Sequence, residues 1–136
     1  MPIDARTEPR GRLRHVIAID AHTLVGDMPR EAGGDDTGPS SHDLFDTSLA
    51  TCMGQTAILY ARLHQWPLER VRLHVERDAS REREGTYALS VTVGFEGDLS
   101  AAQTSRLLEI VDRCPVHRLM TSTTIEIRTV EASGRA

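Results

Sequence analysis

The sequence contains no lysine, and all sixteen of its basic residues are arginines. This absence excludes chemistry that needs a lysine amine, such as a Schiff base or the phosphate site of a P-loop. No apolar run approaches the roughly 18 residues of a transmembrane helix, and residues 1–14 lack the apolar stretch of a signal peptide. The formal net charge of −4 gives no general attraction for nucleic-acid phosphates. We therefore expect a cytoplasmic protein with neither a membrane nor a nucleic acid as partner.

Cysteine is also scarce, with one copy at Cys52 and one at Cys114. One interpretation treats both as small buried apolar side chains, which is the commonest role of free cysteine. A second is a metal site in which His117, spaced as C-x-x-H from Cys114, and His42 supply further ligands. This pattern is incomplete for zinc, so we expect no metal. The third is a redox pair, because a cytosolic disulfide is more often catalytic or redox-sensing than structural.

The sequence around Cys114 favours the redox interpretation. The stretch "VDRCPVHRLM" (residues 111–120) places this cysteine where one predicted helix ends and Pro115 begins another turn. Amide groups at the start of that turn point toward Cys114 and favour its thiolate, and Arg113 and Arg118 flank it. Cys52 lies among apolar and small side chains in a predicted helix. Two thiols brought together from two helices are the arrangement of a peroxidatic and a resolving cysteine, but the spacing leaves their contact open.

The apolar periodicities and turn residues predict an α+β domain with an antiparallel or mixed sheet. The expected order begins with a hairpin of strands 14–20 and 22–28, a loop over 29–41 and a helix from Ser40 or Ser41 to before Pro67. Strands 70–77 and 86–97 follow, and then a helix over 98–114 that Ser100 caps and whose inner stripe is Leu107, Leu108, Ile110 and Val111. A short helical turn over 115–120 and a final strand over 123–130 complete the order.

The domain boundaries follow from composition. Residues 1–12 read as a flexible N-terminal arm, either loose or weakly paired, residues 13–131 as one domain, and residues 132–136 as a polar tail. The first predicted helix is apolar or small on nearly every face, which predicts burial on nearly every side. One small sheet is too little to cover it, so we expect a dimer.

The chain resembles the OsmC/Ohr family of thiol peroxidases. The resemblance rests on "GPSSHDLFDTSLATC", on "RLHQWPLERVRLHVERD" and on the later "CPVH", and it extends from about residue 15 to residue 130. It implies an OsmC-like fold in which antiparallel or mixed sheets wrap around long central helices of an intertwined homodimer, with active sites at the interface. It further implies that Cys52 is the peroxidatic and Cys114 the resolving cysteine, acting on organic (alkyl or fatty) hydroperoxides. A dithiol or lipoyl-type reductant would reopen the disulfide, and no cofactor is needed.

The resemblance is less complete at the residues that activate the peroxidatic cysteine. The best-studied branch of the family uses a glutamate ten residues before that cysteine, where this chain has His42. Asp43 matches the acidic position of the more OsmC-like branch, although a carboxylate there also suits a helix N-terminus. The family's arginine is absent from the predicted hairpin turn, which leaves Arg30 as the nearest candidate or as a solvated loop residue. His42 either tunes the Cys52 thiol or is a polar residue of the first helical turn.

Four apolar side chains precede or follow Cys52 in the predicted helix. Leu44, Phe45, Leu49 and Met53 would suit the alkyl tail of a hydroperoxide as a substrate pocket, or they form plain core. An alternative to catalysis is therefore a non-catalytic dimer that binds an apolar ligand or senses oxidation, because a fold does not guarantee its chemistry.

Overall fold

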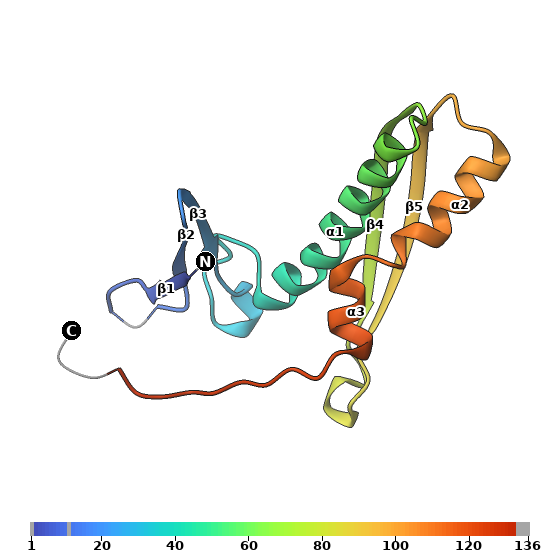
Figure 1. Cartoon of the computed structure of the whole chain (residues 1–136). Helices are drawn as coiled ribbons and strands as arrows, with labels where there is room; N and C mark the ends of the chain where they lie inside the picture. The colour runs from blue at the N-terminus through green and yellow to red at the C-terminus, as the bar shows by residue number, and fades with distance from the viewer. Residues whose placement is uncertain (1, 11, 133–136) are drawn as a thin grey trace. The chain divides into compact units, whose positions relative to one another are not determined.

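The computed structural model describes residues 2–10 and 12–132, whose elements run in the order β1–β2–β3–η1–α1–β4–η2–β5–α2–α3 (Figure 1). They group into two compact units. The first comprises the residues up to Thr51 together with Leu73–Thr92, and the second comprises Cys52–Arg72 together with the residues from Val93 onward. Antiparallel strands combine with helices, so the α+β class is confirmed. The single domain over residues 13–131 stays a prediction, and residues 133–136 of the predicted tail lie outside the described residues.

The first sheet has three antiparallel strands in the order β1–β2–β3. Strands β2 (His15–Ile19) and β3 (His22–Gly26) form the predicted hairpin, with Ile19 opposite His22 and a left-handed φ of 51° at Asp20 in the turn. Strand β1 (Ile3–Thr7) pairs with β2, and all of its residues are exposed. Of the two alternatives for the N-terminal arm, the structure therefore shows a paired strand rather than a loose chain.

The predicted loop after β3 is closed by hydrogen bonds. The amide of Asp27 donates to the carbonyl of Pro39 (3.0 Å), which joins the two ends of the loop. The buried Asp27 carboxylate accepts from the Thr37 hydroxyl (2.5 Å), the Thr37 amide (3.0 Å) and the Met28 amide (2.8 Å). These donors, the Thr37 hydroxyl first, lower the pKa of Asp27 to about 2. One carboxylate thus organises the loop, which contains the short helix η1 (Arg30–Ala32).

Helix α1 (Ser41–Leu63) begins with the predicted serine cap. Ser40 Oγ accepts from the amide of Asp43 (3.1 Å), and the Asp43 carboxylate accepts from the amide of Ser40 (2.9 Å). This reciprocal pair satisfies two amide groups that have no partner inside the helix. Asp43 therefore has the helix N-terminal role that the sequence offered as its alternative.

The end of α1 was predicted from Pro67 alone, and the structure shows a second cause. Gln65 adopts a left-handed φ of 57°, its amide donates to the carbonyl of Arg62 (3.2 Å), and the amide of Trp66 donates to that of Ala61 (2.8 Å). This pair of bonds is a Schellman motif, and it satisfies carbonyls of the last turn. The helix therefore stops before the proline is reached.

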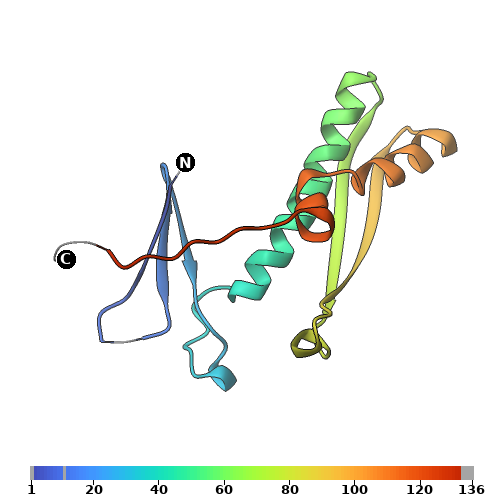
Figure 2. The same ribbon diagram turned by 60° about the horizontal axis from the view of Figure 1, so that its bottom comes forward.

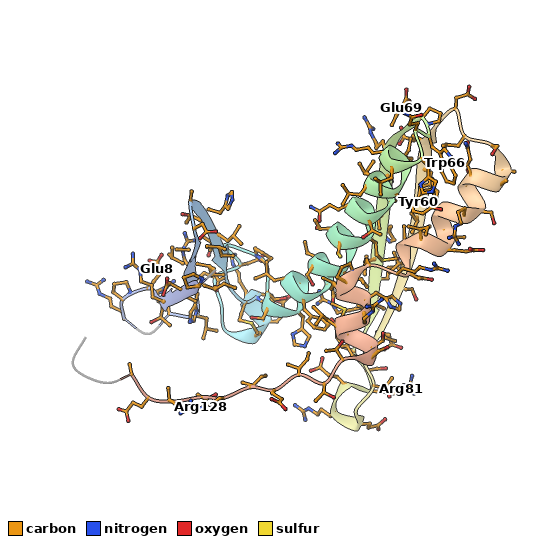
Figure 3. All side chains as sticks on the ribbon, viewed as in Figure 1. Glu8, Tyr60, Trp66, Glu69, Arg81 and Arg128 are labelled. Atoms are coloured by element: carbon orange, nitrogen blue, oxygen red, sulfur yellow. The ribbon has the colours of Figure 1, made fainter. Side chains whose placement is uncertain are left out.

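An aromatic cluster that includes Trp66 fixes this end of α1 against helix α2 (Ala101–Val111) (Figure 3). The Tyr60 ring stacks on His64 (centroids 4.0 Å apart) and meets Trp66 edge-on at 5.4 Å. Arg106 lies over the Tyr60 ring at 5.7 Å and its Nε donates to the Tyr60 hydroxyl (3.1 Å). Cation–π and hydrogen bonding thus join the two helices.

Burial of α1 is one-sided. Its buried apolar residues follow a spacing of four, at Leu49, Met53, Ala57 and Ala61. Phe45, Leu59 and Leu63 are exposed, so the prediction that α1 is buried on nearly every side is wrong for the single chain. The reason is that the described residues cover one stripe of the helix and leave the others open.

The second sheet is the predicted pair of strands, β4 (Leu68–Asp78) and β5 (Ala88–Gly97), which lie side by side (Figure 2). The connection between them contains the short helix η2 (Glu82–Glu84). At the end of β5, Gly97 has a φ of 145°, and a Cβ atom there would lie 2.1 Å from the carbonyl oxygen of Pro67. Glycine is therefore required for the close approach of these two backbone segments.

Helices α2 and α3 (Pro115–Ser122) follow β5. Ser100 caps α2 as predicted, in a reciprocal pair with Gln103. Three members of the predicted inner stripe are buried (Leu107, Ile110 and Val111), but Leu108 is 53% exposed, so its assignment was wrong. Leu108 lies one residue, or about 100°, around the helix from Leu107, which places it off the buried face.

The predicted final strand over residues 123–130 is absent. These residues have no regular secondary structure and follow α3 as an extended stretch (Figure 2). Ile125, Ile127 and Val130, which carry its apolar pattern, are all exposed. A strand requires a neighbouring strand for its backbone hydrogen bonds, and no strand pairs with this stretch among the described residues.

Candidate active site

Cys52 lies in the middle of α1, and its side chain is half-buried beside the buried Met53. Its carbonyl oxygen accepts a hydrogen bond from the Thr56 hydroxyl (2.8 Å), one helical turn further on. The helix backbone holds Cys52 in place, because both its neighbours in sequence are helical.

Cys114 is the N-cap of α3 and is completely buried. Its backbone is extended, with φ −68° and ψ 149°, and Pro115 occupies the first helical position as predicted. The Cys114 sulfur accepts a hydrogen bond from the amide of His117 at 3.3 Å. A cysteine here replaces the oxygen side chains that usually cap helices.

Cys52 and Cys114 are neighbours in the second unit. The Cys52 side chain lies near enough to Cys114 to raise the pKa of its thiol, and both cysteines are free. The spacing of the motifs left this proximity open, and the fold provides it. Two neighbouring free thiols can be joined by oxidation into a disulfide and separated by a reductant.

The pKa of Cys114 differs from the sequence-based expectation. The amides of His117 and Val116 do point at the sulfur and lower its pKa, as predicted. However, burial of the thiol is the larger effect, and the neighbouring Cys52 acts in the same direction, so the pKa of Cys114 is raised. The expected thiolate preference of Cys114 is thus wrong, because burial outweighs the two amides.

A buried carboxylate in the first unit was missed by the sequence analysis. Asp46 accepts hydrogen bonds from Arg77 Nε (2.6 Å) and from the Tyr87 hydroxyl (2.7 Å), and Arg77 also pairs with Asp43. Burial first, and then the bond to Asp46, raise the pKa of Tyr87 to about 12. The amide of Ser40 first, and then Arg77, lower the pKa of Asp43. We call Asp43, Asp46, Arg77 and Tyr87 the Arg77 cluster.

A signal for the Arg77 cluster was present in β4. Val71, Leu73 and Val75 are half-buried and alternate with exposed residues, and Arg77 continues their side of the strand. An arginine at the end of an inward-facing row needs an anionic partner. The alternation thus identifies Arg77 as an arginine that needs an anionic partner, but it does not show that this partner is Asp46.

His42 lies on the exposed side of the first turn of α1 and has a partner. Its Nε2 lies 2.7 Å from Oε1 of Glu82, and its ring lies 5.7 Å from that of Tyr87. Phe45 meets the same tyrosine ring edge-on at 5.8 Å. These side chains and Ser41 line a recess of about 320 Å³. His42 is therefore part of an aromatic recess in the first unit.

The other predicted site residues, except Phe45, do not line this recess. Arg30 lies exposed in η1. Of the proposed substrate pocket, Phe45 lines the recess, Leu49 and Met53 are buried core residues, and Leu44 lies close to Gly26 of β3. Leu49 and Met53 thus fit the interpretation as core, whereas Phe45 is the one of the four that is open to a ligand.

In residues 2–10 and 12–132, no three histidine, cysteine or acidic side chains are grouped as a metal ion would require. In the same residues, no helix has the length and apolar character to span a bilayer.

Comparison with known proteins agrees with this architecture. Solved structures with the same fold include the OsmC-like protein of Mycoplasma pneumoniae (17% identity, 89% of this chain and 86% of that chain, TM-score 0.71). Another is an organic hydroperoxide resistance protein OsmC of Legionella pneumophila (22% identity, 89% of this chain and 88% of that chain, TM-score 0.65). A third is the organic hydroperoxide resistance protein OhrB of Bacillus subtilis (21% identity, 89% of this chain and 90% of that chain, TM-score 0.61). None of the curated proteins matches the chain.

The sequence itself gives the assignment. The family model described as "OsmC-like protein" matches residues 33–129, which include both cysteines, the whole of α1 and the β4–β5 pair. This range covers most of the chain and agrees with the resemblance seen in its motifs. The chain therefore belongs to the OsmC-like protein family.

Proposed function

We propose that the protein is a thiol-dependent peroxidase that reduces organic hydroperoxides through Cys52 and Cys114. The observation that carries this proposal is the proximity of two free thiols, one inside α1 and one at the start of α3. The Cys52 thiolate attacks the terminal peroxide oxygen, the O–O bond breaks, and an alcohol leaves. Cys52 is then a sulfenic acid, and attack by Cys114 on its sulfur forms the disulfide and releases water. An external dithiol or lipoyl-type compound takes up the disulfide by exchange and restores both thiols, without a cofactor.

The surroundings of the two cysteines support this division of roles. Cys52 is half-buried, so a substrate can reach it, whereas Cys114 is fully buried. The raised pKa of Cys114 keeps it as a thiol at neutral pH, and a thiol is a poor nucleophile toward peroxide. The first attack therefore belongs to Cys52 and the second to Cys114. The roles of Arg30, His42 and Asp43 in activating Cys52 stay predictions.

A homodimer in the cytoplasm is part of the proposal. The single chain leaves Leu59 and Leu63 of α1 exposed, and the apolar side chains of residues 123–130 have no neighbouring strand. Apolar surface and an unpaired strand-like segment are both features that association removes. A second copy of the chain would cover α1 and pair with residues 123–130, and the active sites would lie at the resulting interface.

One observation favours a different function. The family position of the activating glutamate holds His42, which pairs with Glu82 beside the recess of Phe45 and Tyr87. A recess with an aromatic wall suits an apolar ligand. The alternative is therefore a non-catalytic dimer that binds such a ligand or senses oxidation through its cysteines.

Turnover of an alkyl hydroperoxide by Cys52→Ser and Cys114→Ser distinguishes these functions. With a dithiol present, we expect the wild-type protein to consume peroxide, to lose two thiols per equivalent of peroxide, and to recover both. Cys52→Ser should abolish consumption, because no sulfenic acid can form. Cys114→Ser is the matched control, which should consume one equivalent and form the Cys52 sulfenic acid in the absence of reductant. Unchanged turnover in Cys52→Ser would remove the proposed mechanism, and an inert wild-type protein would favour the alternative.

A further inference from the structure

Helix α3 depends on Cys114 for the start of its first turn. The Cys114 sulfur accepts from the amide of His117 (3.3 Å), and the Cys114 carbonyl accepts from the amide of Arg118 (3.2 Å). None of the eight residues of α3 is fully buried, so packing contributes little to holding this helix. It continues directly into residues 123–132, which have no regular structure (Figure 1). An element of this kind belongs to the least stable part of a protein.

We propose that Cys114 is a redox-sensitive cap, so that joining it to Cys52 withdraws its sulfur from the His117 amide and loosens α3. The proposal rests on the disulfide of the proposed function. In the oxidation, the S–H bonds of Cys52 and Cys114 and the O–O bond of the peroxide are broken and the S–S bond forms, while the peroxide takes up two electrons and both thiol protons and leaves as alcohol and water. The redox state of the cysteines is thereby transmitted to the backbone of α3.

The geometry requires one sulfur to move. A disulfide bond is about 2.05 Å long, far shorter than the contact between two unbonded sulfur atoms. Cys52 lies inside a helix of 23 residues and next to the buried Met53, so its backbone has little freedom. Cys114 lies between two helices on an extended backbone, and the helix after it has no buried residue. The sulfur of Cys114 therefore moves, and the 3.3 Å hydrogen bond from His117 is lost.

The loss of that bond has a direct consequence for α3. The amides of the first turn have no carbonyl partner inside the helix, so the cap is the partner of the His117 amide. At the usual strength of an N-cap, its removal raises the equilibrium constant for opening of the helix terminus about fivefold. Reduction returns the sulfur to the amide and restores the turn.

Amide hydrogen exchange on the full-length protein tests this proposal. The protein is compared after reduction with dithiothreitol, after one equivalent of an alkyl hydroperoxide, and after the thiol oxidant diamide. We expect the amides of His117 and Arg118 to exchange about fivefold faster once the disulfide has formed. The amides of Gln103 and Thr104 are the internal control, because Ser100 caps α2 with an oxygen that does not respond to oxidation.

Three variants separate the cap from the disulfide. Cys114→Ala, kept reduced, should show the fast exchange of oxidised wild type, because the acceptor is gone. Cys114→Ser, also reduced, keeps an acceptor and should exchange slowly. Cys52→Ser keeps the cap and should show slow exchange before and after the oxidant.

The outcomes also separate this proposal from the peroxidase. The redox-sensitive cap is overturned if the loss of two mass units confirms the disulfide while hydrogen exchange at the His117 amide stays unchanged. Slow exchange in reduced Cys114→Ala does the same. If diamide joins the cysteines and the hydroperoxide does not, the peroxidase fails and the cap proposal stands on the diamide result. If neither oxidant joins them, both proposals are overturned.

Discussion

At the scale of single residues, the buried Asp46 carboxylate shows that sequence patterns place a residue on a face of its element without identifying its partner. The alternation of β4 places Arg77 on the same side as Val71 and Leu73, and the helical spacing places Asp46 one turn after Asp43. Neither pattern says that these side chains meet, since that depends on which face of α1 packs on which face of the strand. The same limit applied to the two cysteines, whose proximity came from the fold and not from their spacing.

Arg77→Met should destabilise the protein by about 3 kcal/mol, because it leaves the Asp46 carboxylate buried without its cationic partner. Methionine retains much of the apolar length of the arginine side chain, so the loss reports mainly the charge. Urea unfolding followed by circular dichroism measures the change.

The matched control for Arg77→Met is Arg72→Met on the same strand. Arg72 pairs with Glu96 in an exposed position, so we expect its loss to cost less than about 1 kcal/mol. Equal effects of the two substitutions would mean that the pairing of Asp46 contributes no more than a surface ion pair.

At the scale of elements, the local signals were sufficient for the helix starts and insufficient for the loop. The caps of α1 and α2 join residues three positions apart, at Ser40 with Asp43 and at Ser100 with Gln103, and such pairs can be recognised in a sequence. The closure of the loop after β3 joins Asp27 to Thr37, ten residues further on. Composition predicted a loop there but not its closure, because glycine and proline content carries no information on a distant hydrogen bond.

The closed loop should contribute a pH-dependent part of the stability. The pKa of Asp27 is about 2 in the folded protein against an ordinary value of 3.8, so its ionised form is favoured by folding. This stabilisation is fully present above pH 3.8 and is lost as the pH falls through about 2. The free energy of unfolding, measured between pH 5 and pH 2, should therefore fall less steeply for Asp27→Asn than for wild type.

Thr37→Val removes the hydroxyl that lowers the pKa of Asp27 most, and it leaves the Thr37 amide in place. We expect the carboxyl resonance of Asp27 to titrate at a higher pH in this variant, in a carbon-detected NMR titration. An unmoved titration would show that the hydroxyl is not the cause of the low pKa.

At the scale of the whole molecule, residues 123–130 show why an element can be predicted and still be absent. Their alternating pattern is typical of a strand, and the prediction failed because no strand of the chain pairs with them in the described structure. The exposed stripes of α1 have the same explanation, since the predicted burial requires a cover that one chain does not supply. The proposed dimer would account for both features, because a second copy would supply the cover for α1 and the neighbouring strand for residues 123–130.

The proposed dimer predicts that Ile127 is buried when two copies associate. Ile127 is 84% exposed in the single chain, so Ile127→Gln should leave the fold of one chain unchanged. Burying an isoleucine contributes about 1.5–3 kcal/mol, and a symmetric dimer buries two, so its Kd should rise on the order of 100-fold or more. Arg128→Gln, one residue later on the same segment (Arg128 is labelled in Figure 3), is the matched control and should change the Kd little, because successive side chains of an extended strand point to opposite faces. Sedimentation equilibrium of the wild type and both variants measures these constants, and a wild-type mass of 15.0 kDa at every concentration would rule out the dimer, because that is the mass of one chain.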